Sequence, residues 1–230
     1  VDPPGIGTKF GDQPIYPRRG SDFSVSVQLT PPYSLWDGKD YKSTALSEQE
    51  RYNWIEFHKW MLKGQWFTPL TRNGNLVLMA RAEMGYLGHY NKNKVSPFER
   101  FEVGGDGMTG YNMYGIDIIS MRGYDDGALD PVGSNYSCAY NKYTMELRYP
   151  LLLKGQTNIY VLGFLEGGNG FTSWKEFSPF KIKRSAGIGV RLFLPVVGMV
   201  GVDWGWGFDP AAGQTKRSGS HIHFTMGMQF

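Results

Sequence analysis

The last ten residues of the chain decide its fold: His221-Ile222-His223-Phe224-Thr225-Met226-Gly227-Met228-Gln229-Phe230. Apolar and polar side chains alternate along this stretch, and a period of two predicts a β-strand with one apolar face. A tilted strand of about this length crosses a bilayer. We therefore expect a membrane strand with His223, Thr225 and Gly227 facing inward. The lipid-facing side chains would be Ile222, Phe224, Met226, Met228 and Phe230.

The composition narrows the function classes. A net charge of +3 over 230 residues is too small to indicate nucleic-acid binding. The single cysteine, Cys138, cannot form an internal disulfide and is interpreted as an incidental thiol. No apolar run approaches the roughly 18 residues of a membrane helix. With 15% aromatic residues and 31 glycines, the chain fits either a transmembrane barrel or a soluble β-sandwich.

Seven further segments are predicted to be strands. One of them, 52–67, is aromatic but alternates poorly, so its faces stay unassigned. In 200–208, one face is built of valine, tryptophan and phenylalanine, which would promote aggregation in water but suits lipid. Its opposite face is mainly glycine, which suits an interior into which another segment of chain must fit. The predicted segments are 23–29, 52–67, 76–86, 142–149, 159–166, 186–194 and 200–208.

The expected connections alternate between short and long. The short ones are 68–74, 150–157 and 195–198, and the long ones are 31–51, 88–140, 168–183 and 209–220. Short periplasmic turns and long extracellular loops are typical of bacterial outer-membrane barrels. The sequence therefore predicts an all-β protein, an antiparallel transmembrane β-barrel of the bacterial outer membrane. Its C-terminus would lie at the periplasmic rim.

The longest connection, residues 88–140, carries two motifs. Arg-Phe-Glu-Val-Gly-Gly spans 100–105, and Met121-Arg122-Gly123-Tyr124 follows after about fifteen residues. Here the chain resembles the BamA family, barrels that insert other barrels into the outer membrane. The spacing between the two motifs is longer than in the family pattern. The resemblance extends through Tyr16–Ser21, Met145–Leu147, Leu165–Gly168, Ser185–Ile188 and the terminal Phe230.

The resemblance implies a loop that folds back into the barrel. Its tip, Met121-Arg122-Gly123-Tyr124, would present Arg122 to acidic residues of the inner wall, which at matching positions are Glu146 and Glu166. The period-two pattern independently places both glutamates on polar faces. An unpaired buried guanidinium is costly, so a confined arginine requires charged acceptors.

The family barrel has about twice as many strands as predicted here and follows periplasmic POTRA domains. We therefore expect residues 1–230 to be the C-terminal part of a sixteen-stranded barrel. The resemblance implies that a client strand adds at a lateral seam beside the last strand. The seam residues would be Phe224, Met226, Gly227, Met228 and Phe230. Implied partners are client outer-membrane β-barrel proteins, accessory assembly lipoproteins and outer-membrane lipids, with no nucleic acid and no cofactor.

Three alternatives remain. A two-partner-secretion-type pore of the same superfamily would share the Arg122 loop, whereas a passive porin would leave that loop unexplained. An enzyme is the third. His221 and His223 lie two apart on one strand face, as a metal pair or proton relay would, but no cysteine or carboxylate is spaced to complete a site. We therefore expect neither catalysis nor a metal.

Overall fold

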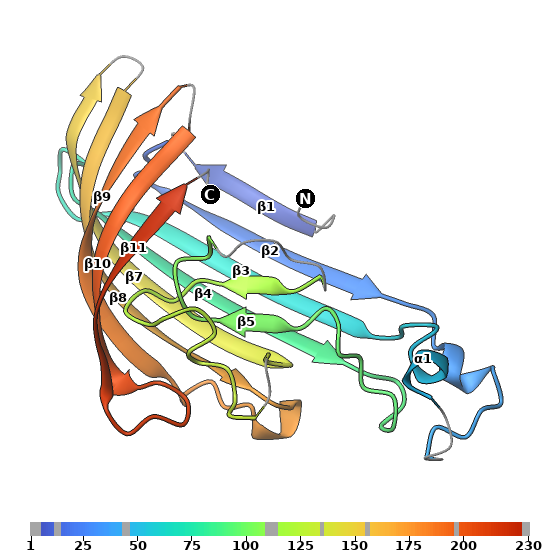
Figure 1. The fold of residues 1–230 in the computed structure, drawn as a ribbon. Coiled ribbons are helices and arrows are strands. Elements are labelled where there is room, and N and C mark those ends of the chain that lie inside the picture. The colour runs from blue at the N-terminus through green and yellow to red at the C-terminus, as the bar shows by residue number, and fades with distance from the viewer. Residues whose placement is uncertain are drawn as a thin grey trace.

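The computed structural model describes residues 6–11, 15–42, 47–108, 115–133, 136–154, 157–195 and 198–226. Its main element is one curved antiparallel sheet whose strands follow the chain order (Figure 1). The strands are β1 (Ile6–Gly11), β2 (Gly20–Leu29), β3 (His58–Pro69), β4 (Val77–Gly88), β7 (Ala139–Lys154), β8 (Thr157–Phe171), β9 (Lys183–Leu194), β10 (Gly198–Pro210) and β11 (Arg217–Met226). The predicted all-β antiparallel fold is confirmed. No helix within these ranges has the length and apolarity needed to span a membrane.

The two faces of the sheet have opposite chemistry, as the alternation predicts. Apolar side chains lie exposed on the outer face of successive strands: Phe23, Trp66, Leu147, Leu165, Ile188, Trp204 and Phe224. Their neighbours along the strands are polar and buried, including Thr144 on β7, Asp203 on β10 and His223 on β11. A sheet with an apolar outer face and a polar inner face suits lipid outside and a filled interior.

The strands differ from the prediction in number and extent. All eight predicted strands are present, and β1 is a ninth that the sequence did not reveal. The predicted strand 52–67 is displaced, because 52–57 belong to the preceding connection and β3 continues to Pro69. Trp60 and Trp66 lie on its outer face, and Lys59 is buried on its inner face.

The alternation of connections holds with one exception. Residues 70–76, 155–156 and 195–197 join strands at one end of the sheet, and 30–57, 89–138 and 172–182 join them at the other. The predicted long connection 209–220 is wrong. Strands β10 and β11 extend into it, so only 211–216 connect them.

The connection between β4 and β7 packs against the concave side of the sheet (Figure 1). It contains a parallel pair, β5 (Phe101–Val103) and β6 (Asp117–Ile119). A buried cluster joins this pair to the sheet: Phe57, Leu87, Phe101, Val103, Ile119, Met121, Tyr124, Leu129 and Tyr140. The two motifs lie next to each other despite the extra residues between them. They bring Gly105 and Met121 side by side, with a 2.9 Å hydrogen bond from the Met121 amide to the Gly105 carbonyl.

Candidate functional site: the loop tip on the inner wall

Arg122, at the tip of the long connection, lies against the inner wall formed by β7 and β8. Its Nη2 is 2.7 Å from Glu146 Oε1 and 2.6 Å from Glu166 Oε1. Its Nε and its backbone amide also donate to Glu166, at 3.1 and 2.9 Å. Arg122, Glu146 and Glu166 are all less than 7% exposed. The tip is thus held by charge-assisted hydrogen bonds from both the side chain and the main chain.

The surrounding charges balance. Arg122 Nη1 lies 3.6 Å from Asp203 Oδ2 on β10. Asp203 also forms a two-pronged pair with Arg191, at 2.8 and 2.7 Å, and Arg148 Nε donates to Glu146 at 2.8 Å. Three guanidinium groups therefore meet three carboxylates. Such mutual pairing offsets the large cost of removing these charges from water.

Two further effects act on the Arg122 guanidinium. Burial disfavours its charged form, but the carboxylates of Glu166, Glu146 and Asp203 outweigh burial and raise its pKa above the ordinary value. The guanidinium also lies 3.8 Å from the centre of the Phe164 ring, in a cation–π contact. Arg122 is therefore a permanent cation at this site.

Gly123 brings the tip into backbone contact with β10. Its φ is +87°, a conformation that residues with a Cβ rarely adopt. A Cβ on Gly207 would lie 2.3 Å from the Gly123 carbonyl oxygen, and one on Gly205 would lie 2.7 Å from the Gly123 nitrogen. The glycines on the inner face of β10 therefore leave room for the backbone of the loop tip, as the sequence predicts.

The tip also contacts β11 and the start of β9. The Gly123 amide donates to His223 Nε2 at 2.8 Å. The Tyr124 hydroxyl donates to the Arg184 carbonyl at 2.8 Å. Met121 is fully buried in the cluster between loop and sheet. Arg122, Gly123 and Tyr124 together thus contact β8, β9, β10 and β11, and Arg122 also reaches β7.

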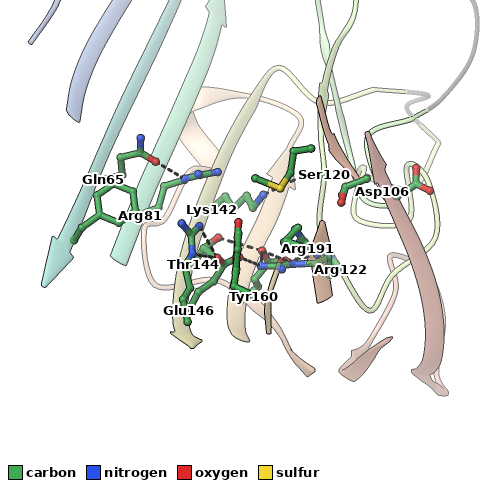
Figure 2. A pocket seen from close by; sticks show the side chains of 15 residues that line it. Gln65, Arg81, Asp106, Ser120, Arg122, Lys142, Thr144, Glu146, Tyr160 and Arg191 are labelled. Carbon is green, nitrogen blue, oxygen red and sulfur yellow. Dashed lines mark hydrogen bonds and ion pairs between the residues drawn. The ribbon is translucent and has the colours of Figure 1, made fainter. Parts of the chain in front are cut away.

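Arg122, Glu146 and Glu166, which we call the clasp, form part of the lining of a polar cavity (Figure 2). Arg81, Lys142, Tyr160 and Arg191 are among the side chains that line it. Lys142 Nζ lies 3.3 Å from the hydroxyl of Ser120, next to the tip. In the described ranges no three His, Cys, Asp or Glu side chains are grouped to hold a metal ion. The arrangement is suited to holding a loop through ion pairs.

Not every residue predicted from the sequence can be placed. Phe224 and Met226 lie on the outer face of β11, opposite Val202 and Val200 of β10. Gly227, Met228 and Phe230 lie outside the described residues. Sequence reasoning missed Asp203 and Arg191 as members of the charge cluster. Their only signal was a lone charge on each inward face, and the pairing register that joins them is not written locally in the sequence.

Comparisons with known proteins agree with this architecture. A family model described as the Omp85 superfamily domain matches residues 8–230. BamA of Neisseria meningitidis serogroup B, an outer membrane protein assembly factor, is 26% identical over 145 residues. These are 63% of this chain and 13% of that protein. The crystal structure of Haemophilus ducreyi BamA lacking POTRA domains 1–3 superposes with a TM-score of 0.62 at 18% identity, covering 95% of this chain.

The chain therefore spans 40% of the solved BamA structure and a smaller share of the curated relative. The structural likeness confirms the barrel-type fold, and the matches confirm the resemblance to the BamA family. The family model, which covers nearly the whole sequence, shows that the chain belongs to the Omp85 superfamily.

Proposed function

We propose that this chain is the C-terminal part of the barrel of an outer-membrane protein assembly factor, which folds and inserts client β-barrel proteins. Family membership and the likeness to BamA support the proposal. Its partners would be client outer-membrane β-barrel proteins, accessory assembly lipoproteins and the lipids against the outer face. No bond chemistry is involved.

The observation that carries the proposal is the clasp between Arg122 and the pair Glu146 and Glu166. A passive pore needs an open interior, and a buried, multiply bonded loop tip obstructs it. An assembly factor instead needs strands that are held in place beside a strand edge that can accept a client. The ion pairs of Arg122 hold the loop tip against β7 and β8 in this way.

The edge that would accept the client is β11. In the described structure β11 pairs with β10, and no described strand pairs with its other edge. A client strand can add there by β-augmentation, which satisfies backbone groups that have no water in lipid. Phe224 and Met226 would then face lipid beside the client.

The orientation proposed for the membrane follows from the connections. Strand β11 runs from the end with the long connections to the end with the short turns, where Met226 lies opposite Val200. Short turns are periplasmic in barrels of this kind. The C-terminal end of β11 would accordingly lie at the periplasmic rim.

The test is client insertion by the full-length protein in liposomes, measured as heat-modifiable folding of an added barrel. Arg122→Ala should slow insertion by about tenfold or more, since the tip loses its hold on the wall. The matched control is Arg184→Ala, which removes the same charge from an exposed pair with Asp209. No insertion by the wild-type protein would refute the proposal, and equal insertion by both variants would refute the role given to Arg122. Export of a soluble client without insertion would favour the secretion-pore alternative.

A further inference from the structure

His223 joins the loop tip to the last described strand. It is 4% exposed on the inner face of β11, and its Nε2 accepts the Gly123 amide at 2.8 Å. The neighbouring His221 ring stacks on it at 6.0 Å. His221 itself contacts Asp125 Oδ1 at 3.1 Å, and that aspartate side chain is 83% exposed. Of the two histidines, His223 alone bonds to the backbone of the motif.

The protonation state of His223 decides whether this bond exists. A backbone amide can only donate, so Nε2 must carry a lone pair and the ring must be neutral. A protonated ring would place an N–H opposite the Gly123 N–H, which removes the bond and sets two donors against each other. Histidine changes charge between about pH 5 and 8, within reach of ordinary conditions.

Titratable groups from several neighbouring elements act electrostatically on His223. They are His221 on its own strand, Asp203 on β10, Glu166 on β8, and Asp106 and Asp126 on the loop. Asp203 lies directly opposite His223 in the β10–β11 register. The carboxylates favour a protonated ring, whereas burial and His221 oppose it. Asp203 and Glu166 are already engaged by arginines, which leaves them less free to hold an imidazolium.

We propose that His223 is a positioning residue that latches the loop tip to β11 while its ring is neutral and releases it when the ring is protonated. The hydrogen bond between Gly123 and His223, and its loss on protonation, do not depend on what the protein does. Its consequence, that acid loosens the hold on the strand where a client would enter, rests on the proposed function.

The test is amide hydrogen exchange of residues 121–124 and of β11 in the full-length protein in lipid nanodiscs, expressed as protection factors at pH 7.5 and 5.0. Wild-type protection should fall about tenfold at the lower pH, beyond the intrinsic change. His223→Gln, whose carbonyl accepts a hydrogen bond but does not titrate, should keep similar protection at both values. His223→Phe, which has no acceptor, should lose it at both.

His221→Gln is the matched control, and it should retain the wild-type response to pH because His223 is intact. The proposal is overturned if His223→Gln responds to pH as the wild type does, or if His223→Phe keeps its protection. Should His223→Phe fail to fold, the comparison of wild type with His223→Gln still decides. Because exchange is measured without any client, this result is independent of the insertion experiment.

Discussion

The long connection is anchored to the sheet at two places, and the two anchors have opposite polarity. At the tip, the loop supplies the cation Arg122 and the wall supplies Glu146 and Glu166. At the base, the wall supplies the cation Lys59, whose Nζ lies 2.6 Å from Asp117 and 3.3 Å from Glu99 of the loop.

The anchors also differ in their access to water. The tip partners have side chains at most 8% exposed, whereas Glu99 and Asp117 are 31% and 38% exposed. A carboxylate that loses its partner at the base is hydrated more readily than one at the tip, which lies almost wholly buried. The cost of breaking an ion pair is mainly the cost of the charge left behind. The tip should therefore be intolerant of change and the base tolerant.

The largest expected effect is at the tip. Arg122→Ala leaves the buried Glu166 without its arginine partner and should lower the free energy of unfolding by about 3–5 kcal/mol. Arg122→Lys should recover only part of this loss, because a point charge cannot replace the guanidinium fork that reaches both glutamates. Urea unfolding of the full-length protein in lipid measures both. A loss below about 1 kcal/mol would mean that the tip is as hydrated as an exposed pair.

A second prediction concerns the effect of pH on the part of the loop near the base. Asp130 lies near the base, where it accepts hydrogen bonds from the Val103 amide and the Ser137 hydroxyl. Burial raises its pKa from 3.8 to about 7. The folded state thus binds the proton more tightly than the unfolded state, so this stabilisation is complete below about pH 4 and is lost as pH rises through 7.

From pH 5 to pH 8 the loop should lose about 1–2 kcal/mol of stability, measured by its resistance to protease. Asp130→Asn should remove most of this dependence, since the amide does not titrate. If the variant loses stability over that range as the wild type does, the dependence arises elsewhere in the loop.

The smallest effect is expected for Lys59→Met at the base. Its carboxylate partners can turn to water, and methionine retains most of the packing against Phe101, over whose ring Lys59 Nζ lies at 5.1 Å. The expected loss is about 1 kcal/mol, close to that of an exposed pair. The measurement is the same urea titration. A loss equal to that of Arg122→Ala would abolish the distinction between tip and base.

The fold was predictable where one face of a strand is purely apolar. Strand β10 is such a case, because lipid and interior demand opposite side chains at alternate positions. Strand β3 was not, since Met61 and Phe67 face inward against buried apolar clusters, so that both of its faces carry apolar side chains. Strand β1 was not predicted because its six residues include two glycines and carry no continuous apolar face.

The site was predictable to the extent that it is local. The sequence motif and the polar faces pointed to Arg122, Glu146 and Glu166, and the role of these residues remains a prediction. The contribution of Asp203 and the bond between Gly123 and His223 depend on how distant strands are registered. No short stretch of sequence contains that information.

The breadth of the tip's contacts has a mechanical consequence. Three consecutive residues, Arg122, Gly123 and Tyr124, contact β7, β8, β9, β10 and β11, so the tip crosses the concave side of five adjacent strands. Flattening the sheet lengthens that span, whereas the loop backbone cannot stretch. The contacts of the tip are therefore coupled to the curvature of the sheet.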